Sequence, residues 1–273
     1  MDYDDQKEDY LNLEGSEALK QASLIIFEGL KNLLVNMDIY LIRIQPKLRD
    51  NNWFFTPSMD ANLWNFIRDN IDQKNDIESF LNDAFVNYFS SENFSNLDFM
   101  VQTWRYSPLL SDRLHILKEC VSVLKDSSSK NSNIENPHYI VIPTLIAQID
   151  GSMTNYLLKN GYDYEGQKLK NASNGQTDKK ENLFREEVTK FLYEKYSKDL
   201  SVSTFLLEEG TTAIHLLLDI LFQRAFPEQK MDDLIFPFSR NKIMHGQFLG
   251  YGNAEDTIRL FLLLDFIASL KDT

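Results

Sequence analysis

The sequence predicts an all-α protein, with a helical region at the N-terminus followed by a helical bundle at the C-terminus. Hydrophobic residues make up 43% of the 273 residues, and over most of the chain they recur at steps of three and four, the spacing of one helix face. Only 10 glycines and 7 prolines are present, too few for the turns of a β-sandwich. A chain of this length buries a substantial core, in one large domain or two small ones.

In the N-terminal half, helices are expected wherever this spacing continues. Pro46 is expected to end the first helix, and Ser111 is suited to cap the last one. Residues 51–57 form a turn rich in aromatic residues, which we interpret as a packing plug. We likewise interpret the three tryptophans as packing anchors: Trp53, Trp64 and Trp104. The expected helices lie at 17–41, 59–71, 75–90 and 111–125.

A polar segment without periodicity separates the two halves. Residues 126–136 are almost entirely polar or charged, and Pro137 closes the segment. Composition of this kind is typical of a domain boundary. The sequence therefore predicts an N-terminal helical region of unknown role over residues 1–130 and a second helical domain over residues 137–273.

The second half begins with a strongly apolar segment, Tyr139–Leu158. Its β-branched start resembles a strand, but its length and spacing favour a buried helix. Residues 159–182 hold three glycines and almost no aliphatic residues, so a mobile surface loop is expected there. The lysines of this loop either contact an anionic partner or are solvated: Lys168, Lys170, Lys179 and Lys180. Two more helices are expected at 183–197 and 203–225.

The last helix has the clearest signals in the chain. Asn253 is a natural N-cap, and Glu255 and Asp256 place negative charge in the first turn, where the helix dipole favours it. Residues 257–270 are apolar nearly all round. Such a helix must be buried, either in the core or against a second subunit.

The charge distribution bears on partners and location. The formal net charge of −13 argues against broad, non-specific binding to phosphates, but much of it lies in residues 1–20, and the C-terminal end is close to neutral. The acidic start and the lack of an apolar run of about 18 residues predict a cytoplasmic protein without a membrane span. The single cysteine, Cys120, rules out an internal disulfide and is expected to be a buried thiol.

One segment combines an arginine with a histidine: Phe238-Ser239-Arg240-Asn241-Lys242-Ile243-Met244-His245-Gly246. In a short helix, Arg240 and Met244 are one turn apart, and we expect His245 only slightly further round, so that guanidinium and imidazole converge on one anion. Arginine binds a phosphoryl group through two parallel hydrogen bonds. Histidine gives and takes protons near neutral pH. The pair therefore suits phosphate chemistry.

This motif resembles the R-x4–6-H signature of the HEPN superfamily, helical proteins many of which are metal-independent ribonucleases. The segment from His245 to Asp265 is also similar to the C-terminal end of bacterial HEPN-like proteins, as is the earlier Ile142–Gly151, where an acidic residue precedes a glycine. The resemblance covers roughly residues 137–270. It implies that the C-terminal domain is a HEPN-like bundle.

The resemblance further implies a homodimeric endoribonuclease, a toxin or antiviral defence effector, in which two copies of the motif face each other across one RNA cleft. His245 would move protons at the ribose 2′-hydroxyl or the leaving 5′-oxygen, Arg240 would stabilise the phosphorane, and Asn241 would orient phosphate or imidazole. No metal or other cofactor would be required. Further RNA contacts would come from four residues: Lys242, Tyr251, Arg259 and Asp150.

Other interpretations of the same residues remain open. Arg240 can instead cap helix carbonyls while His245 makes one hydrogen bond in the core, and Asp150 can cap a helix end before Gly151. The protein is then a catalytically inactive HEPN-like dimerisation or binding module, or a helical adaptor whose acidic surface or N-terminal region serves a protein partner. We interpret His115 and His215 as structural histidines in apolar helices and His138 as a residue at a helix start; four scattered histidines give little support for a metal site.

Overall fold

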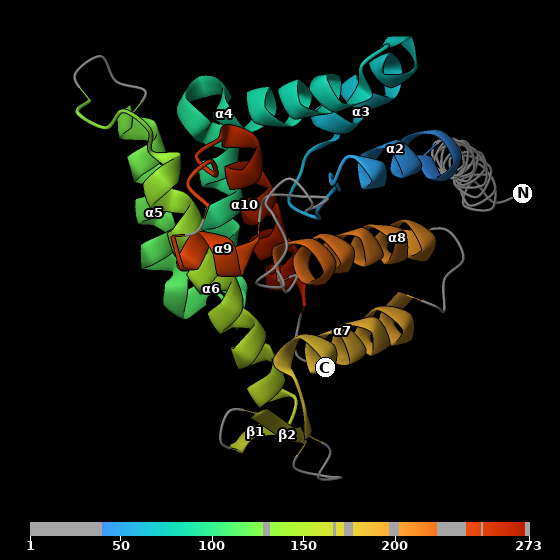
Figure 1. Ribbon diagram of the computed structural model, residues 1–273. Helices are drawn as coiled ribbons and strands as arrows, with labels where there is room; N and C mark the ends of the chain where they lie inside the picture. The colour runs from blue at the N-terminus through green and yellow to red at the C-terminus, as the bar shows by residue number, and fades with distance from the viewer. Residues whose placement is uncertain are drawn as a thin grey trace, which may run out of the picture. The chain divides into compact units, whose positions relative to one another are not determined.

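The computed structural model describes residues 40–127, 132–165, 168–171, 177–196, 202–222, 239–246 and 248–270. These residues are mostly helical, which confirms the all-α prediction (Figure 1). The chain separates into two compact units, Met1–Arg43 and Ile44–Thr273. The helix expected at 17–41 lies outside the described residues except at its end, where Tyr40–Ile44 form a π-helical turn, η1.

The second unit begins with two short helices. In α2 (Gln45–Asp50), Pro46 lies in the first turn, so it begins a helix and does not only end the preceding one. A proline in the first turn costs no hydrogen bond, because an N–H at this position would have no partner within the helix. Helix α3 (Ala61–Asn70) is capped by Asp60, whose carboxylate accepts the Asn62 N–H at 2.8 Å. A 3-10 turn, η2 (Ile71–Gln73), follows.

Helix α4 (Ile77–Thr103) is interrupted by a left-handed turn. Its expected part, 75–90, is regular and capped by Asp76. At Glu92, Asn93 and Phe94 the backbone has φ of 48°, 55° and 62°, a region that L-residues enter at a cost of about 1–2 kcal/mol each. The carbonyl of Tyr88 accepts bonds from the Ser91 hydroxyl at 3.1 Å and the Asn96 amide at 2.9 Å, which compensates part of this cost.

The expected domain boundary does not divide the structure into two bodies. Two 3-10 turns, η3 (Trp104–Tyr106) and η4 (Ser111–Arg113), lead into α5 (Leu114–Ser127), and the long α6 (His138–Lys159) follows. Ser111 thus begins a 3-10 turn and does not cap α5. Helix α4 packs against α10 and α5 packs against α6, so the division at 126–136 was wrong: that segment joins two helices within one compact unit.

The segment expected to be a surface loop contains a small antiparallel sheet, so this prediction was wrong. Its strands are β1 (Tyr162–Glu165), β2 (Lys168–Asn171) and β3 (Thr177–Asp178), paired in that order. Tyr162 and Leu169 are buried, at 4% and 2% exposure, and the Tyr162 hydroxyl donates to Glu187 at 2.8 Å. These two buried side chains anchor the sheet, although the segment contains almost no aliphatic residues.

The remaining elements build the C-terminal part of the unit. They are α7 (Lys180–Tyr196), α8 (Val202–Ile214), the π-helix η5 (His215–Leu221), the short α9 (Arg240–Met244) and α10 (Ala254–Ser269). Asn253 caps α10 as predicted, accepting the Asp256 N–H at 2.7 Å. Every residue from Asp256 to Ile267 is buried, which confirms the expectation of a buried last helix.

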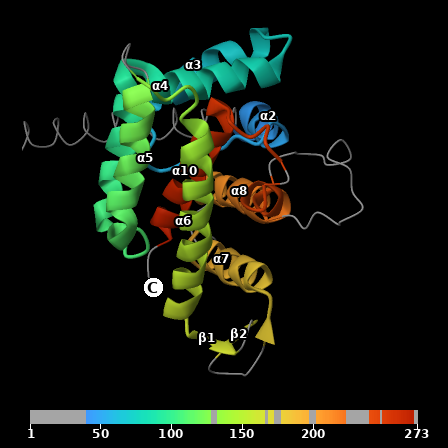
Figure 2. The same cartoon turned by 60° about the vertical axis from the view of Figure 1, so that its left-hand side comes forward.

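Helix α10 is the centre of the packing. It contacts α6 most extensively, then α4, and also α8. Figures 1 and 2 show α7 and α8 side by side below α3 and α4, with the small sheet at the far end of α6. The aromatic plug also forms as expected: Trp53, Phe54 and Phe55 are at most 6% exposed, and the Trp53 ring stacks on Phe85 at 4.3 Å.

Charged groups are buried beside this core. The Asp265 carboxylate accepts from the Trp104 indole at 2.6 Å and the Ser58 hydroxyl at 2.8 Å, yet burial still raises its pKa. Glu209 on α8 is 4% exposed. One of its oxygens accepts the backbone N–H of Phe55, and the other has no partner among the described residues. Burial raises the pKa of this carboxyl well above the usual range.

We expect Glu209→Gln to stabilise the protein increasingly as the pH rises. Folding raises the pKa of this carboxyl. The folded state therefore keeps its full stability below the pKa of the unfolded state, about 4.3, and loses stability as the pH rises through the pKa of the folded state. Glutamine keeps the acceptor for Phe55 and cannot ionise. Urea unfolding at pH 5 and pH 8 measures this, and an equal difference between variant and wild type at both pH values would contradict it.

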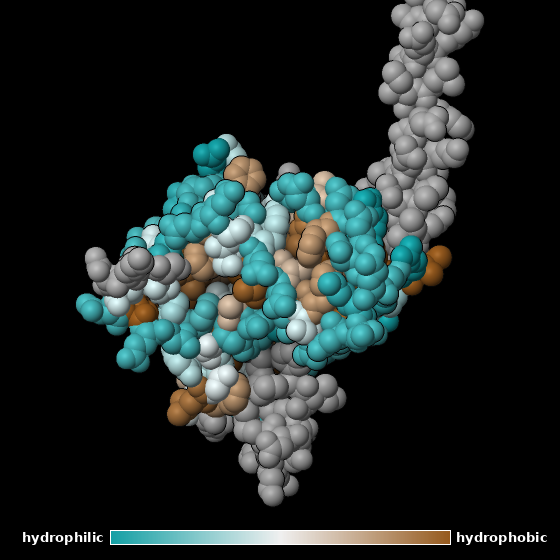
Figure 3. Space-filling model, turned by 90° about the horizontal axis from the view of Figure 1, so that it is seen from above, coloured by the Kyte–Doolittle hydropathy of each residue, from teal (hydrophilic) through white to brown (hydrophobic). Residues whose placement is uncertain are grey.

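None of the helices in the described part of the chain combines the length and the apolar character needed to cross a bilayer. Figure 3 looks down on the side of α3 and α4, where hydrophilic residues dominate and hydrophobic ones form small separate groups. Cys120 is buried, as predicted, and burial raises the pKa of its thiol to about 11.

Candidate functional site

The predicted short helix exists and ends at the histidine. Helix α9 spans Arg240–Met244, and His245 is its C-cap, with its N–H bonded to the Asn241 carbonyl at 3.1 Å. Gly246 follows with φ of 65°, the left-handed conformation that glycine adopts after a helix end without steric cost. The His-Gly pair therefore has a local structural reason, since the glycine reverses the chain directly after the histidine.

Arg240 lies at a partly exposed position among weakly held partners. Its side chain is 34% exposed, and Nη2 lies 3.4 Å from Asp150 Oδ2. Nη1 donates to Asn241 Oδ1 at a long 3.4 Å, and the guanidinium lies over the Phe222 ring at 5.3 Å. Long contacts of this kind hold the arginine loosely, and its remaining N–H donors stay available to an anion.

His245 is exposed to solvent. Within the described residues its imidazole makes no hydrogen bond or ion pair; only its backbone N–H is bonded. The interpretation in which His245 forms a core hydrogen bond is therefore wrong for the described part of the chain. An imidazole without a partner keeps both ring nitrogens available for proton transfer.

The two side chains do not share one face of α9. Five residues along a regular helix turn the chain by about 140° beyond one full turn, so the expectation that His245 lies only slightly further round than Met244 was wrong. Arg240 faces α6 and Phe222, through Asp150 and the ring contact, whereas His245 faces solvent. Any centre that uses both groups on one phosphate needs the ligand, or a second chain, to span them.

Asp150 lies within α6, which continues past it to Lys159, so it does not cap a helix end. Its carboxylate binds Lys180 Nζ at 2.6 Å and Arg240 at 3.4 Å, and no contact joins it to His245 within the described residues. Gly151 is explained by packing and not by a helix end, because a Cβ at this position would come within 2.6 Å of the Arg113 guanidinium. The Asp-Gly pair thus accommodates two arginines on neighbouring faces of α6.

Two residues expected to contact RNA are buried. Lys242 is 6% exposed and Arg259 is 5% exposed. Arg259 binds Asp256 at 3.0 Å and Asn82 at 3.0 Å, and its guanidinium lies 4.3 Å from the centre of the Trp53 ring. The structure therefore corrects both assignments: Arg259 is part of the core, and Lys242 is turned away from solvent.

Tyr251 is half-buried near the N-terminus of α6. Its ring packs edge-on against Tyr139 at 5.2 Å, and its hydroxyl donates to the Tyr139 carbonyl at 3.5 Å. Next to it, the Gly252 carbonyl accepts the Asn136 amide at 2.8 Å. This position is explained by packing, and no contact joins Tyr251 to Arg240 or His245 in the described part of the chain.

Of the other three histidines, His115 is exposed on α5. His215 is exposed on η5, and its Nδ1 contacts Asp219 at 3.0 Å, so its ring has a polar partner, as expected of a structural histidine. His138 lies at the start of α6 as expected, bonded to the Thr257 hydroxyl at 2.7 Å, and burial lowers its pKa. The i, i+4 spacing of His215 and Asp219 could have predicted a second polar site. It was overlooked because both residues lie in a mostly apolar stretch of the sequence.

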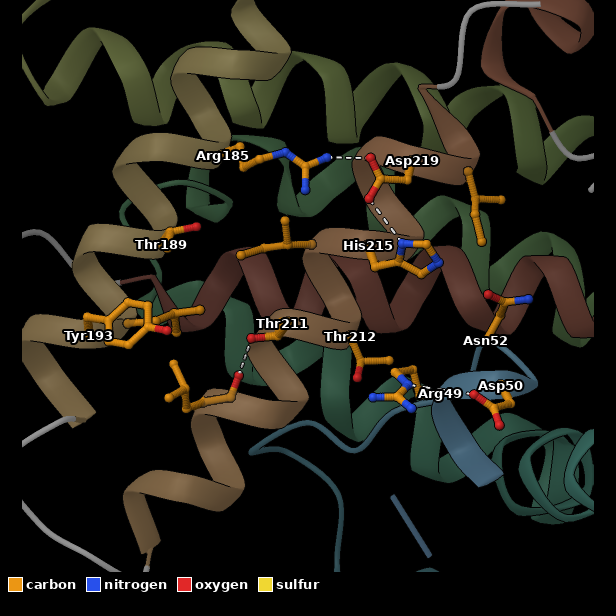
Figure 4. A pocket seen from close by; sticks show the side chains of 14 residues that line it. Arg49, Asp50, Asn52, Arg185, Thr189, Tyr193, Thr211, Thr212, His215 and Asp219 are labelled. Atoms are coloured by element: carbon orange, nitrogen blue, oxygen red, sulfur yellow. Dashed lines mark hydrogen bonds and ion pairs between the residues drawn. The ribbon is translucent and has the colours of Figure 1, made fainter. Parts of the chain in front are cut away.

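His215 and Asp219 line a cleft of the described unit. This cleft has a volume of about 820 Å³ and lies between α2, α7, α8 and η5 (Figure 4). A smaller pocket of about 420 Å³ shares Arg185 and Asp219 with it and reaches Phe222, the ring beneath Arg240. The two candidate sites are therefore neighbours.

The arrangement at α9 offers an arginine and a free imidazole, the groups used in acid–base chemistry on phosphate esters. Within the described ranges, no three His, Cys, Asp or Glu side chains lie close enough together to hold a metal ion. Comparison with known protein families, curated proteins and solved structures finds no match to this chain. The support for the candidate site is therefore the chemistry of its own residues.

Proposed function

We propose that this chain is a metal-independent endoribonuclease of the HEPN type, acting as a homodimer in the cytoplasm as a toxin or antiviral defence effector. His245 moves the proton of the ribose 2′-hydroxyl or of the leaving 5′-oxygen. Arg240 stabilises the charge on the pentacoordinate phosphorus. The products are a 2′,3′-cyclic phosphate and a 5′-hydroxyl.

The single observation that carries this proposal is the exposed imidazole of His245 five residues after a partly exposed arginine. A structural histidine is generally hydrogen-bonded, because an unsatisfied buried polar group is costly. His245 instead faces solvent, bonded only through its backbone. This is the state that a proton-transfer group requires before its substrate arrives.

The placement of the two side chains supports a dimer. Arg240 faces α6 and His245 faces solvent, so among the described residues the two groups of one chain do not converge on one phosphate. A second copy supplies the missing wall when two α9 helices face each other, so that the arginine of one chain and the histidine of the other meet one phosphate. Closed symmetry of this kind is the commonest form of homo-oligomer.

The proposal is tested by incubating the purified full chain with RNA in EDTA. We expect cleavage to continue, and we expect the 3′ ends to be cyclic phosphates, which a phosphatase removes only after acid has opened the ring to a phosphomonoester. Size-exclusion chromatography with light scattering reports the dimer in the same preparation. Intact RNA at all protein concentrations, or 3′-hydroxyl ends, would refute the proposal.

One observation favours a second candidate, a catalytically inactive HEPN-like binding module. Arg240 already contacts Asp150, so the arginine has a structural partner. In that case the dimer forms without RNA cleavage, and the acidic N-terminal region recruits a protein partner. Stable dimers together with uncut RNA in the same experiment would support this candidate.

A further inference from the structure

The cleft between α7, α8 and η5 has the form of a ligand site that the proposed ribonuclease does not use. Its volume of about 820 Å³ lies in the range of pockets for small molecules, about 300–1,000 Å³. Residues from two helix faces form its walls. Arg185, Thr189 and Tyr193 recur at steps of four along α7, opposite Leu207, Thr211 and His215 of α8 and η5.

One end of the cleft carries an arginine and a histidine held by a carboxylate. Arg185 Nη2 donates to Asp219 at 2.5 Å, and His215 Nδ1 contacts the same carboxylate at 3.0 Å. The contact at Nδ1 orients the imidazole ring. The bond to Asp219 occupies one of the five N–H donors of Arg185, and the other donors of its planar fork suit an oxyanion.

A second arginine approaches this end from another element. Arg49 of α2 is half exposed and contacts only Asp50, at a long 3.6 Å, among the described residues. Figure 4 shows His215 between the two arginines, with Arg185 above it beside Asp219 and Arg49 below it beside Asp50. Two guanidiniums and one imidazole from three elements therefore line the same cleft, in a chain whose net charge is −13.

The other end of the cleft is aromatic and apolar. Tyr193 is 55% exposed, a high value for a large ring, and lies at the end of the cleft away from His215 (Figure 4). Aliphatic side chains and threonines form the wall between the two ends: Leu192, Leu207, Ile214 and Ile220, with Thr189, Thr211 and Thr212. A ring and an aliphatic wall accept a flat heterocycle by stacking.

The local backbone agrees with a built site. His215 and Asp219 both belong to η5, a π-helical segment of seven residues. Such segments are rare and frequently occur at functional sites, because they lose the regular ladder of the α-helix to reorient a few side chains. Here the segment carries both His215 and Asp219, and Asp219 binds Arg185.

We propose that this cleft binds a nucleotide, with its phosphate between Arg185, Arg49 and His215 and its base on Tyr193. The nucleotide is either a free mononucleotide or one unit of an RNA strand. The second source is reasonable because the smaller pocket links Arg185 and Asp219 to Phe222, which lies under Arg240. The binding chemistry is the same for both sources and does not depend on ribonuclease activity.

Isothermal titration of the full chain tests this site, with adenosine 5′-monophosphate, adenosine, inorganic phosphate and an uncleavable six-residue 2′-O-methyl oligonucleotide as probes. We expect the monophosphate to bind at least tenfold more tightly than adenosine or phosphate alone, because it engages both ends. Arg185→Gln and Arg49→Gln should each weaken it about tenfold, which corresponds to about 1.4 kcal/mol. Both side chains are about half exposed, so folding should be unaffected.

The matched control is Arg68→Gln, an arginine on α3 that also pairs with an aspartate, Asp69 at 2.8 Å, outside the cleft. It should bind like wild type. Binding of the oligonucleotide alone, lost in Arg185→Gln, assigns the site to an RNA unit. The proposal is overturned if neither nucleotide probe binds, if adenosine binds as well as its monophosphate, or if both cleft variants bind like the control.

Discussion

His245→Ala is expected to lower the rate of RNA cleavage by about 10²–10⁴-fold, the usual contribution of general acid–base catalysis. Arg240→Ala should cost a similar factor, because it removes the charge that faces the developing oxyanion. Initial rates on a labelled RNA in EDTA measure both effects. Because His245 is exposed and its ring has no partner within the described residues, the free energy of unfolding should change by about 0.5 kcal/mol or less.

His115→Ala is the control for this experiment. His115 is also exposed and helical, on α5, and should cleave RNA at the wild-type rate. A loss of activity in His115→Ala, or full activity in His245→Ala, would remove His245 from the mechanism. Mixing the inactive Arg240→Ala and His245→Ala chains provides a further check. If one centre takes its arginine and histidine from different copies, the mixed dimer should regain part of the activity.

Arg259→Ala is expected to lower the free energy of unfolding by about 3–5 kcal/mol, the cost of breaking a buried ion pair by removing one partner. Arg259 is 5% exposed and Asp256 is 6% exposed, and burial already raises the Asp256 pKa against the influence of Arg259. The alanine also removes the hydrogen bond to Asn82 and the contact with the Trp53 ring. Urea unfolding at neutral pH measures the effect.

Two variants isolate the buried charge as the cause. Arg185→Ala breaks an ion pair whose side chains are 43% and 45% exposed, so its cost should be at most about 1 kcal/mol. The double variant Asp256→Asn with Arg259→Met leaves no buried charge and should recover much of the loss. Equal costs for Arg259→Ala and Arg185→Ala would contradict this account.

The helices could be predicted from the sequence because burial of one face leaves a direct pattern. The apolar spacing of Tyr139–Leu158 and the cap at Asn253 specified α6 and α10 to within a few residues. The small sheet was missed because two buried residues, Tyr162 and Leu169, carry it, and so few apolar positions give no period. The sequence did not predict the single compact unit from Ile44 onward. Contacts between α4 and α10 hold its two halves together, and the composition of residues 126–136 gives no information about such long-range contacts.

The candidate site was only partly predictable. The short helix at Arg240 and its end at His245 follow from local signals, the glycine above all. The burial of Arg259 does not, because its partners include Asn51 and Asn82, far away in sequence. The same holds for the proposed nucleotide cleft, whose two arginines and histidine come from α2, α7 and η5. Charged residues in sequence do not reveal which of them meet across the fold.

Asp150 holds two cations at once, Lys180 at 2.6 Å and Arg240 at 3.4 Å. If Arg240 were the only cation beside Asp150, its movement toward a substrate would leave this half-buried carboxylate without a counter-ion. The free-energy cost of the unpaired charge would oppose the movement. Here the lysine stays behind and keeps the carboxylate neutralised. In the proposed ribonuclease, Arg240 would therefore exchange the aspartate for a phosphate at little electrostatic cost and return to the aspartate once the product has left.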